Sequence, residues 1–569
     1  MKKITHLGIA FSIACLIDGP SLAAEAPPND TTFEQIVDDF VYGTLALSPT
    51  AATGVGYHVH RGIPLDDVLD DFSPEGIEDA HRLLNDVEAR VAKIDVSSLD
   101  PQQQADIDII RDAIGAQRLD LDEIQTYKHN PTSYVELVGN ALYTPYVLQY
   151  APVLERYKHI VKRMKKIPEL VREAEANLVD SPEEWNRVAR EENAGNIDLI
   201  DGPLRSDCPR NLRSEYGKAA TAALLSLKSF SAWLEKDLSK RTSDWRLGKD
   251  LYAKKFRYVL ATGKTPDALL AEAEDDLVKI REQMAALAAP RTVEAALAEV
   301  ASHHATPESF MASAKVALVS ATEFVKAKDL LTLPPQSNLQ VIETPEFMRG
   351  IYGVGGFNPA PALEPRLGSF YWVTPIPSTW PQSRIDSKLR EYNDSGLQHL
   401  TVHEAMPGHY VQGEYANEVQ PKSRRLLRSI YGNGPYVEGW AVYAQQLMAD
   451  EGYLGDNVGY RLTLLKQMLR VTANTILDVR LQTLGMTDAQ ALDLMTQQTY
   501  QETEEAHAKL QRAKLSSCQL PTYYAGFKGW LTVRDHYAVT HAAASLKEFH
   551  EAALREGAVP LPVLDELLQ

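Results

Sequence analysis

Cysteine is scarce in this chain, which has 3 cysteines among 569 residues. Cys15 lies close to the N-terminus, so only Cys208 and Cys518 remain in the body of the sequence. Two isolated cysteines do not form the closely spaced sets that hold structural zinc, which excludes a cysteine-based metal framework. Whether these two thiols pair is left open, because pairing depends on their distance in the fold.

Long hydrophobic runs are also missing. Beyond the N-terminus, no stretch approaches the roughly 18 consecutive apolar residues that a transmembrane helix needs, so we expect no integral membrane segment there. The N-terminus begins with Lys2 and Lys3, continues with an apolar run over residues 7–17 and reaches Ser21-Leu22-Ala23. This order is typical of a signal peptide over residues 1–23 and predicts an exported, periplasmic protein. The alternatives are a lipoprotein modified at Cys15 and a buried N-terminal helix.

An excess of positive charge is the third absence. The formal net charge is −19, which repels nucleic acid and anionic membrane surfaces and gives no support to a partner that binds a basic patch. The hydrophobic fraction of 44% and the charged fraction of 24% are ordinary for a soluble globular protein. The length exceeds what one hydrophobic core supports, so we expect two lobes that meet across a deep cleft. The oligomeric state is not predicted.

What the sequence does contain is helical periodicity, which starts with Phe33, Ile36, Val37 and Phe40. Several helical segments are expected to begin at a hydroxyl–proline–carboxylate tripeptide. The hydroxyl suits the N-cap, the proline suits the first turn and the carboxylate suits the positive end of a helix. These tripeptides begin at Ser73, Ser181, Thr265, Thr306 and Thr344. We predict a mainly α fold, with an N-terminal helical region over residues 24–330.

Prolines and glycines crowd residues 331–390, where the helical periodicity is lost. Residues 339–342 and 368–373 have the composition of short strands, which predicts a small β-sheet inserted between two helical regions. This sheet is either a cleft wall whose strand edge binds an extended peptide or a purely structural hairpin. Helical periodicity returns over residues 391–569, in the segments 396–406, 435–450, 459–484, 487–513 and 530–555. Residues 331–569 are therefore expected to form one catalytic region.

The chemistry is concentrated in the motif His403-Glu404-Ala405-Met406-Pro407-Gly408-His409. On a regular helix, residues six apart point about 240° from one another, so an unbroken helix would separate the two imidazoles. Proline removes a helical hydrogen bond, and glycine tolerates unusual dihedral angles. We therefore predict that the helix ends or bulges at Pro407 and that His409 returns toward His403 as a second metal ligand.

Glu438 is the best candidate for a third ligand. It lies 34 residues after Glu404, near the start of the next periodic segment and after the breaker Asn433-Gly434-Pro435. Two imidazoles and one carboxylate suit one zinc ion with an open position for water, and Glu404 would act as general base on that water. The rival ligand pair is His399 with His403, at ordinary helical spacing.

At these motifs the chain resembles the bacterial DUF885 family, which is usually described as uncharacterised and grouped with zinc peptidases of the gluzincin type. The resemblance includes Glu438-Gly439-Trp440-Ala441-Val442-Tyr443 and Gln519-Leu520-Pro521-Thr522-Tyr523-Tyr524-Ala525-Gly526. It implies a largely helical fold with a deep cleft, and zinc held by His403, His409 and Glu438. It also implies that Tyr523 donates to the oxyanion of the transition state.

The resemblance further places Arg512 near the arginine that precedes the tyrosine motif, where it would hold a substrate carboxylate. Typical members carry Asp-Thr-Gly-x-His in the helix after the third ligand, and this chain has 478–482 with Arg480 and Gln482 instead. A glutamate expected shortly after Tyr443 is replaced by Gln445 or Gln446. The substrate contacts of typical members are therefore not carried over.

These observations predict a zinc metallopeptidase that hydrolyses short peptides, with some preference for carboxypeptidase action because of Arg512. The alternatives are a zinc hydrolase of a non-peptide amide or ester, and a non-catalytic periplasmic binding protein that kept the fold. Glu404, His403, His409 and Glu438 are all present, which favours catalysis over the binding protein.

Overall fold

The computed structural model describes residues 32–334, 338–344 and 355–569. The expected signal peptide, residues 1–23, lies outside the described residues, and so does Cys15. Within the described ranges, no helix combines the length and the apolar character needed to cross a membrane.

The first part of the chain is helical, as expected. Its helices are α1 (Phe33–Leu47), α2 (Pro49–Val55), α3 (Pro74–Val91), α4 (Pro101–Arg118), α5 (Thr126–His129), α6 (Pro131–Val147), α7 (Val153–Asn177), α8 (Glu183–Asp201), α9 (Pro203–Ser206) and α10 (Arg213–Lys236). They are followed by α11 (Gly248–Leu260), α12 (Pro266–Ala288), α13 (Val293–Ala301) and α14 (Phe310–Lys328). A two-stranded antiparallel pair, β1 (Val59–His60) and β2 (Ile63–Pro64), follows α2.

Two of the five expected caps are confirmed. Ser73 and Thr265 each accept a hydrogen bond from a backbone N–H of the first turn, in α3 and α12. The other two described tripeptides were wrongly interpreted. The hydroxyl of Ser181 donates to the Pro182 carbonyl, and α14 begins at Phe310, after the Thr306 tripeptide. The tripeptide at Thr344 extends outside the described residues.

A small three-stranded sheet stands between the helical parts. Strands β3 (Leu339–Glu343) and β5 (Ser369–Val373) confirm the two expected strands, and β4 (Gly355–Asn358) is a third that the sequence did not predict. The order is β3-β5-β4, with β5 parallel to β3 and antiparallel to β4. The prediction of a mainly α fold with a small inserted sheet is therefore confirmed.

The rest of the chain is again helical. Its helices are α15 (Gln382–Glu391), α16 (Asp394–Glu404), α17 (His409–Ala416), α18 (Lys422–Ile430), α19 (Gly434–Asp450), α20 (Val458–Thr483), α21 (Asp488–Asp493), α22 (Thr503–Leu515), α23 (Pro521–Thr540), α24 (Leu546–Arg555) and α25 (Leu561–Leu567).

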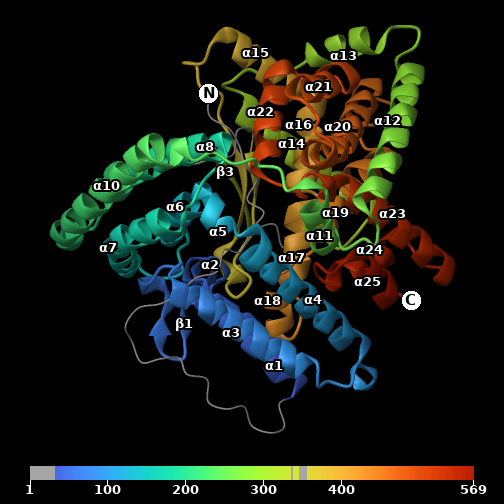
Figure 1. Ribbon diagram of the computed structural model, residues 1–569. Coiled ribbons are helices and arrows are strands. Elements are labelled where there is room, and N and C mark those ends of the chain that lie inside the picture. The colour runs from blue at the N-terminus through green and yellow to red at the C-terminus, as the bar shows by residue number, and fades with distance from the viewer. Residues whose placement is uncertain (1–31, 335–337, 345–354) are drawn as a thin grey trace.

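The buried hydrophobic side chains form two clusters. The smaller one belongs mainly to α6, α7, α8 and α10, and the larger one joins α1, α3 and α4 with α11–α25. Figure 1 shows the helices of the smaller cluster on one side of the sheet and α12, α19, α20 and α23 on the other. Side chains from before and after residue 330 share the larger cluster. The expected boundary between two regions at residue 330 and the expected deep cleft stay predictions.

The central strand β5 connects the two clusters. Tyr371 and Val373 belong to the larger cluster, whereas Phe370 and Trp372 pack in the smaller one. Successive side chains of a strand point to opposite faces, so each face of β5 serves a different cluster. The Tyr371 hydroxyl lies 3.2 Å from the Thr401 hydroxyl, which ties this strand to α16.

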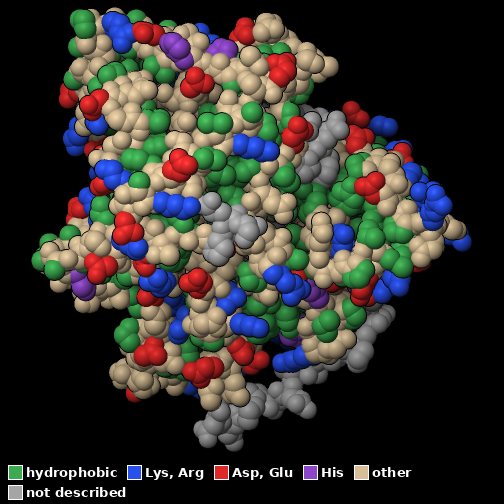
Figure 2. All heavy atoms as spheres, turned by 180° about the vertical axis from the view of Figure 1, so that it is seen from behind, with side chains coloured by type: hydrophobic (Ala, Val, Ile, Leu, Met, Phe, Trp, Pro, Cys, Tyr) green, Lys and Arg blue, Asp and Glu red, His purple; other side chains and the backbone are tan. Residues whose placement is uncertain are grey.

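The remaining features concern charge and thiols. The face opposite to that of Figure 1 carries acidic and basic side chains interspersed, so the negative charge is not gathered into one patch there (Figure 2).

Cys208 and Cys518 are both buried free thiols and belong to different clusters, so they do not pair with each other.

Candidate metal centre

The helix that carries His403 and Glu404 ends where the spacing of the histidines required a break. Helix α16 ends at Glu404, and α17 begins with His409 itself. In the link between them, the Gly408 N–H donates to the Val402 carbonyl at 2.9 Å, so the link folds back on the last turn of α16. The predicted interruption between the two histidines is confirmed, although the helix ends at Glu404, three residues before Pro407, where the break was expected.

Gly408 is required by the closeness of this return. A Cβ atom there would lie 1.9 Å from the His403 carbonyl oxygen and 2.4 Å from that of Val402, far inside contact distance. The link is also held from the side by Trp440, whose indole N–H donates to the Pro407 and Gly408 carbonyls at 2.9 and 3.3 Å. Trp440 is completely buried, so this clamp is shielded from water.

Three side chains converge at this place: His403, His409 and Glu438. The Nε2 atoms of both imidazoles lie 3.6 Å from Oε2 of Glu438, and the two rings meet edge to face at 84° with centroids 4.7 Å apart. One ligand atom from each residue lies within 4.8 Å of the others. Their side chains are 15%, 12% and 18% exposed, so the group is mostly buried but keeps some contact with solvent.

Glu438 is held by the start of α19. The side chain of Asn433 accepts a hydrogen bond from the Tyr436 N–H at 3.0 Å, and Pro435 stands in the first turn. The predicted breaker, residues 433–435, therefore separates α18 from α19 and caps the first turn of α19. Glu438 follows directly and faces the histidines.

The electrostatics of this cluster suit a cation. Burial opposes charge on Glu438, but His403 and His409 outweigh it and lower the pKa of its carboxyl well below the usual range. Burial likewise opposes protonation of His409, but Glu438 and then Glu404 raise the pKa of that imidazole. Glu438 Oε2 is buried, and no hydrogen-bond partner for it is found in the described part of the chain. A buried carboxylate oxygen without a donor costs free energy, and a metal ion at the convergence point would satisfy it.

Glu404 is buried beside this group without belonging to it. Glu404 is 6% exposed, and its negative charge acts on His409 and on Tyr371.

His399, the alternative ligand, lies elsewhere: its Nε2 is 3.0 Å from the Tyr460 carbonyl and its ring stacks on the Tyr460 ring at 4.1 Å. Burial lowers the pKa of His399 to about 4, as expected for a neutral core histidine.

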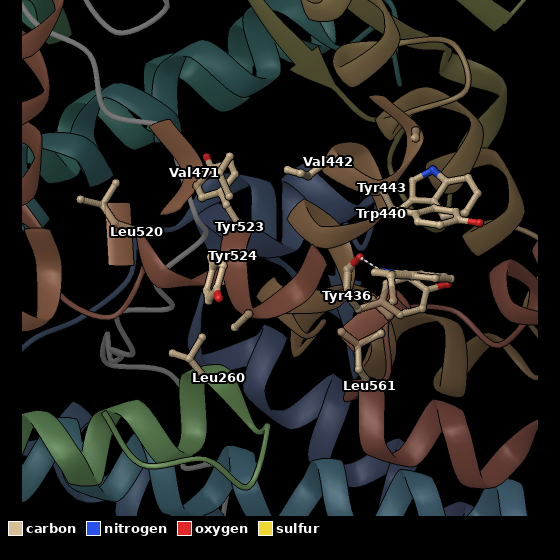
Figure 3. Close-up of a cluster of buried hydrophobic side chains, with 14 of the residues drawn as sticks. Leu260, Tyr436, Trp440, Val442, Tyr443, Val471, Leu520, Tyr523, Tyr524 and Leu561 are labelled. Atoms are coloured by element: carbon tan, nitrogen blue, oxygen red, sulfur yellow. Dashed lines mark hydrogen bonds between the residues drawn. The ribbon is translucent and has the colours of Figure 1, made fainter. Parts of the chain in front are cut away.

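Tyr523 reaches the group through a close crossing of α19 and α23. A Cβ on Gly439 would lie 2.3 Å from the Gly526 carbonyl carbon, and a Cβ on Gly526 would lie 2.0 Å from the Pro435 carbonyl oxygen. The two backbones therefore touch at these glycines, directly beside Glu438. Figure 3 shows Tyr523 and Tyr524 from α23 lying across from the α19 side chains. The Tyr523 ring lies 6.4 Å from the His403 ring, nearly parallel to it.

Arg512 is the last predicted site residue, and it contacts Tyr523. Its Nη2 donates to the Gln519 side-chain oxygen at 2.6 Å and lies 3.5 Å from the Tyr523 hydroxyl. Burial first, and then the charge of Glu438, raises the pKa of Tyr523 to about 12, so its hydroxyl keeps its proton at neutral pH. All the predicted site residues thus lie in one neighbourhood, while their roles stay predictions.

The positions that depart from the family pattern have structural partners. Asp478 accepts hydrogen bonds from the Tyr252 hydroxyl at 2.7 Å and from the Cys518 N–H at 2.8 Å. Arg480 pairs with Glu274. Gln482 accepts a hydrogen bond from the Leu247 N–H at 2.9 Å. These contacts join α20 to its neighbouring segments.

Gln445 also has a structural partner. Its side chain donates to the His399 carbonyl at 3.0 Å, so it braces α16 from α19.

Sequence reasoning missed the part played by Phe357. This residue lies on β4, and its ring is 6.3 Å from the rings of both His409 and Tyr410. Strand β4, an outer strand of the sheet, therefore borders the candidate metal centre. A glycine pair followed by one aromatic residue is too weak a strand signal to have found it.

The comparisons with known proteins agree on the family and the fold. The family model for bacterial proteins of unknown function, DUF885, matches residues 49–568. A solved structure from Shewanella oneidensis, described as a candidate lipoprotein of unknown function, is 27% identical with a TM-score of 0.79, covering 95% of this chain and 100% of that one. A candidate lipoprotein from Colwellia psychrerythraea is 17% identical with a TM-score of 0.76, covering 94% and 98%. No curated protein matches the chain.

Proposed function

The chain belongs to the bacterial DUF885 family, and from its site we propose that it is a zinc-dependent peptidase that hydrolyses short peptides. One observation carries the proposal. The side chains of His403, His409 and Glu438 converge on one point, although the two histidines are six residues apart and on different helices.

The donor set fits zinc. Two imidazole nitrogens and one carboxylate oxygen are a ligand set of catalytic zinc sites, which leave one position open. A bound zinc ion would act as a Lewis acid, which polarises the scissile carbonyl and lowers the pKa of a bound water. The buried Oε2 of Glu438, which has no hydrogen-bond partner among the described residues, and the partial exposure of the three side chains support such a site.

The remaining steps belong to the residues of the chain. Glu404, next to His403 but outside the converging group, takes a proton from the attacking water and later gives it to the leaving amine. The Tyr523 hydroxyl, which keeps its proton because the pKa is about 12, donates to the oxygen that becomes negative.

The surroundings support a peptide as substrate. Strand β4 is an outer strand of its sheet, and Phe357 on it lies beside His409. An outer strand can pair with an extended peptide through its backbone. Arg512 lies beside Tyr523, and a guanidinium there would hold a terminal carboxylate, which favours removal of residues from the carboxyl end.

We also propose that the protein is exported. The N-terminal pattern of lysines, apolar residues and small residues supports export. The description of the Shewanella oneidensis protein as a candidate lipoprotein is consistent with this.

The test begins with elemental analysis of the purified protein, which should show one zinc ion that chelation removes. A mixed peptide library is then incubated with the protein, with and without chelator, and the products are identified by mass spectrometry. Glu404→Gln should keep zinc and lose turnover, whereas the control Glu414→Gln should keep both, because Glu414 contacts Asn338 away from the ligands. The proposal is rejected if the library stays intact with zinc bound, or if Glu404→Gln works like the wild type.

A further inference from the structure

A largely buried cluster of charges lies between α15, α20 and α22 and includes Arg512. Its two carboxylates, Glu391 and Glu505, are outnumbered by five cations, which are Lys388, Lys466, Arg470, Lys509 and Arg512. An excess of positive charge in a largely buried cluster is unusual in a chain whose formal net charge is −19. Apart from Arg512, the proposed peptidase site does not use these charges.

The two carboxylates are already engaged. Glu391, which is 2% exposed, pairs with Lys466 at 2.8 Å and with Arg470 at 3.3 Å. Glu505 pairs with Lys388 at 3.0 Å. Among the described residues, neither carboxylate forms an ion pair with the remaining two cations, although the charges of both act on Lys509.

Lys509 and Arg512 are these remaining cations, and they lie three residues apart on α22. Lys509 is 7% exposed, and its ammonium donates to the Asn474 side-chain oxygen at 2.8 Å. In the described part of the chain, neither Lys509 nor Arg512 forms an ion pair. A buried ammonium without a paired counter-ion is costly. Burial, followed by Arg470 and Arg512, lowers the pKa of Lys509 well below its ordinary value, and the opposing charges of Glu391 and Glu505 do not offset this.

The position of these two cations connects them to the candidate metal centre. Arg512 contacts Tyr523, whose ring lies beside His403. Val471, on the α20 turn between Arg470 and Asn474, belongs to the same buried cluster as Tyr523 (Figure 3). Residues three apart on a helix have Cβ atoms about 5–6 Å apart, a separation that the two carboxylates of one acidic amino acid can span.

We infer that Lys509 and Arg512 form a paired anion site that selects peptides ending in glutamate or aspartate. Arg512 takes the terminal carboxylate, and Lys509, with Arg470 behind it, takes the side-chain carboxylate. This inference rests on the proposed peptidase function, which it deepens by naming the substrate class. The substrate supplies the counter-ion that α22 and α20 lack.

The first experiment measures binding and does not depend on turnover. Glutarate, with two carboxylates, and butyrate, with one, are titrated into the zinc-loaded protein by calorimetry. Glutarate should bind at least about tenfold more tightly, and Lys509→Met should remove this difference. Lys509→Arg keeps the charge and should retain much of it. Lys514→Met, on the same helix but paired with Glu184 and Asp488, should leave the difference unchanged.

The second experiment compares the isosteric peptides Ala-Ala-Glu and Ala-Ala-Gln. The wild type should cleave the glutamate peptide at least about tenfold more efficiently, measured as kcat/KM, because the glutamine leaves the buried cation without an anion. Lys509→Met should lose this preference and still cleave the glutamine peptide. The inference is overturned if both diacid and monoacid bind alike to the wild type, or if Lys509→Met lowers both peptides equally.

The two proposals fail separately. If glutarate binds through Lys509 but no peptide is cleaved, the anion site stands and the peptidase function falls. If peptides are cleaved without regard to a terminal glutamate, the peptidase function stands and the anion site falls.

Discussion

The contact between Gly439 and Gly526 leads to the sharpest prediction. In Gly439→Ala, the new Cβ would lie 2.3 Å from the Gly526 carbonyl carbon, 2.5 Å from its Cα and 2.7 Å from its carbonyl oxygen. Ordinary contacts begin at 3.4 Å, so α19 and α23 must separate by about 1 Å. All three opposing atoms belong to the backbone, which cannot rotate away as a side chain could. Overpacking of this kind costs about 1–3 kcal/mol of unfolding free energy.

The same separation has a distinct effect on the site. The three candidate ligands lie on α16, α17 and α19, whereas Tyr523 lies on α23, so the movement shifts Tyr523 relative to Glu438. We expect Gly439→Ala to bind zinc but to lose about a hundredfold in kcat, because a displacement of about 1 Å is enough for such a loss. The thermal midpoint of unfolding, the zinc content and the kcat on one peptide are measured for each variant.

Gly217→Ala is the matched control, because Gly217 is also helical and a Cβ added there would have nothing within 4 Å. It should raise stability by about 0.5–1 kcal/mol through helix propensity and leave zinc and kcat unchanged. The reasoning is refuted if Gly439→Ala melts at or above the midpoint of Gly217→Ala with full activity.

Three further predictions follow from single contacts. Trp440→Phe removes the indole N–H that holds the Pro407 and Gly408 carbonyls, and should cost about 1–3 kcal/mol in thermal unfolding and weaken zinc binding measured with a competing chelator. Tyr523→Phe should bind zinc like the wild type but lower kcat by about 10²–10³, and an unchanged kcat would remove the oxyanion role. Burial raises the pKa of Asp478 from 3.8 to about 6, so its contribution to stability is fully present below pH 3.8 and is lost as the pH rises through about 6. The difference in unfolding free energy between Asp478→Asn and the wild type should therefore shift by about 3 kcal/mol in favour of the variant between about pH 4 and about pH 7.5. The thermal midpoints of both proteins, measured at the two pH values, check this.

The arrangement of the histidines was predictable because it followed from local geometry. A separation of six residues cannot place two side chains on one helical face, and the only breakers between them were Pro407 and Gly408. The same local reasoning found α12 at residues 266–288, because its cap, proline and periodicity all agree. These features depend on neighbours within a few residues.

Features that depend on distant partners could not be predicted in the same way. The contact of Gly439 with Gly526 joins residues on separate helices, and a glycine in a helix gives no sign of which backbone approaches it. The interpretation of Ser181 as a cap failed because its hydroxyl donates to the next carbonyl while its backbone N–H binds the Arg241 carbonyl. Lys509 was likewise hidden, since nothing in its sequence surroundings shows that it is buried.

The distribution of the two hydrophobic clusters along the chain has a consequence for biosynthesis. The smaller cluster draws almost wholly on residues 69–238, so it can condense while the rest of the polypeptide is still being made. The larger one runs from Ile36 to Leu564 and needs nearly the last turn of helix before it can close. A nascent chain halted before α23 would therefore contain the complete smaller cluster. It would expose apolar side chains of the incomplete larger cluster, which chaperones and proteases recognise.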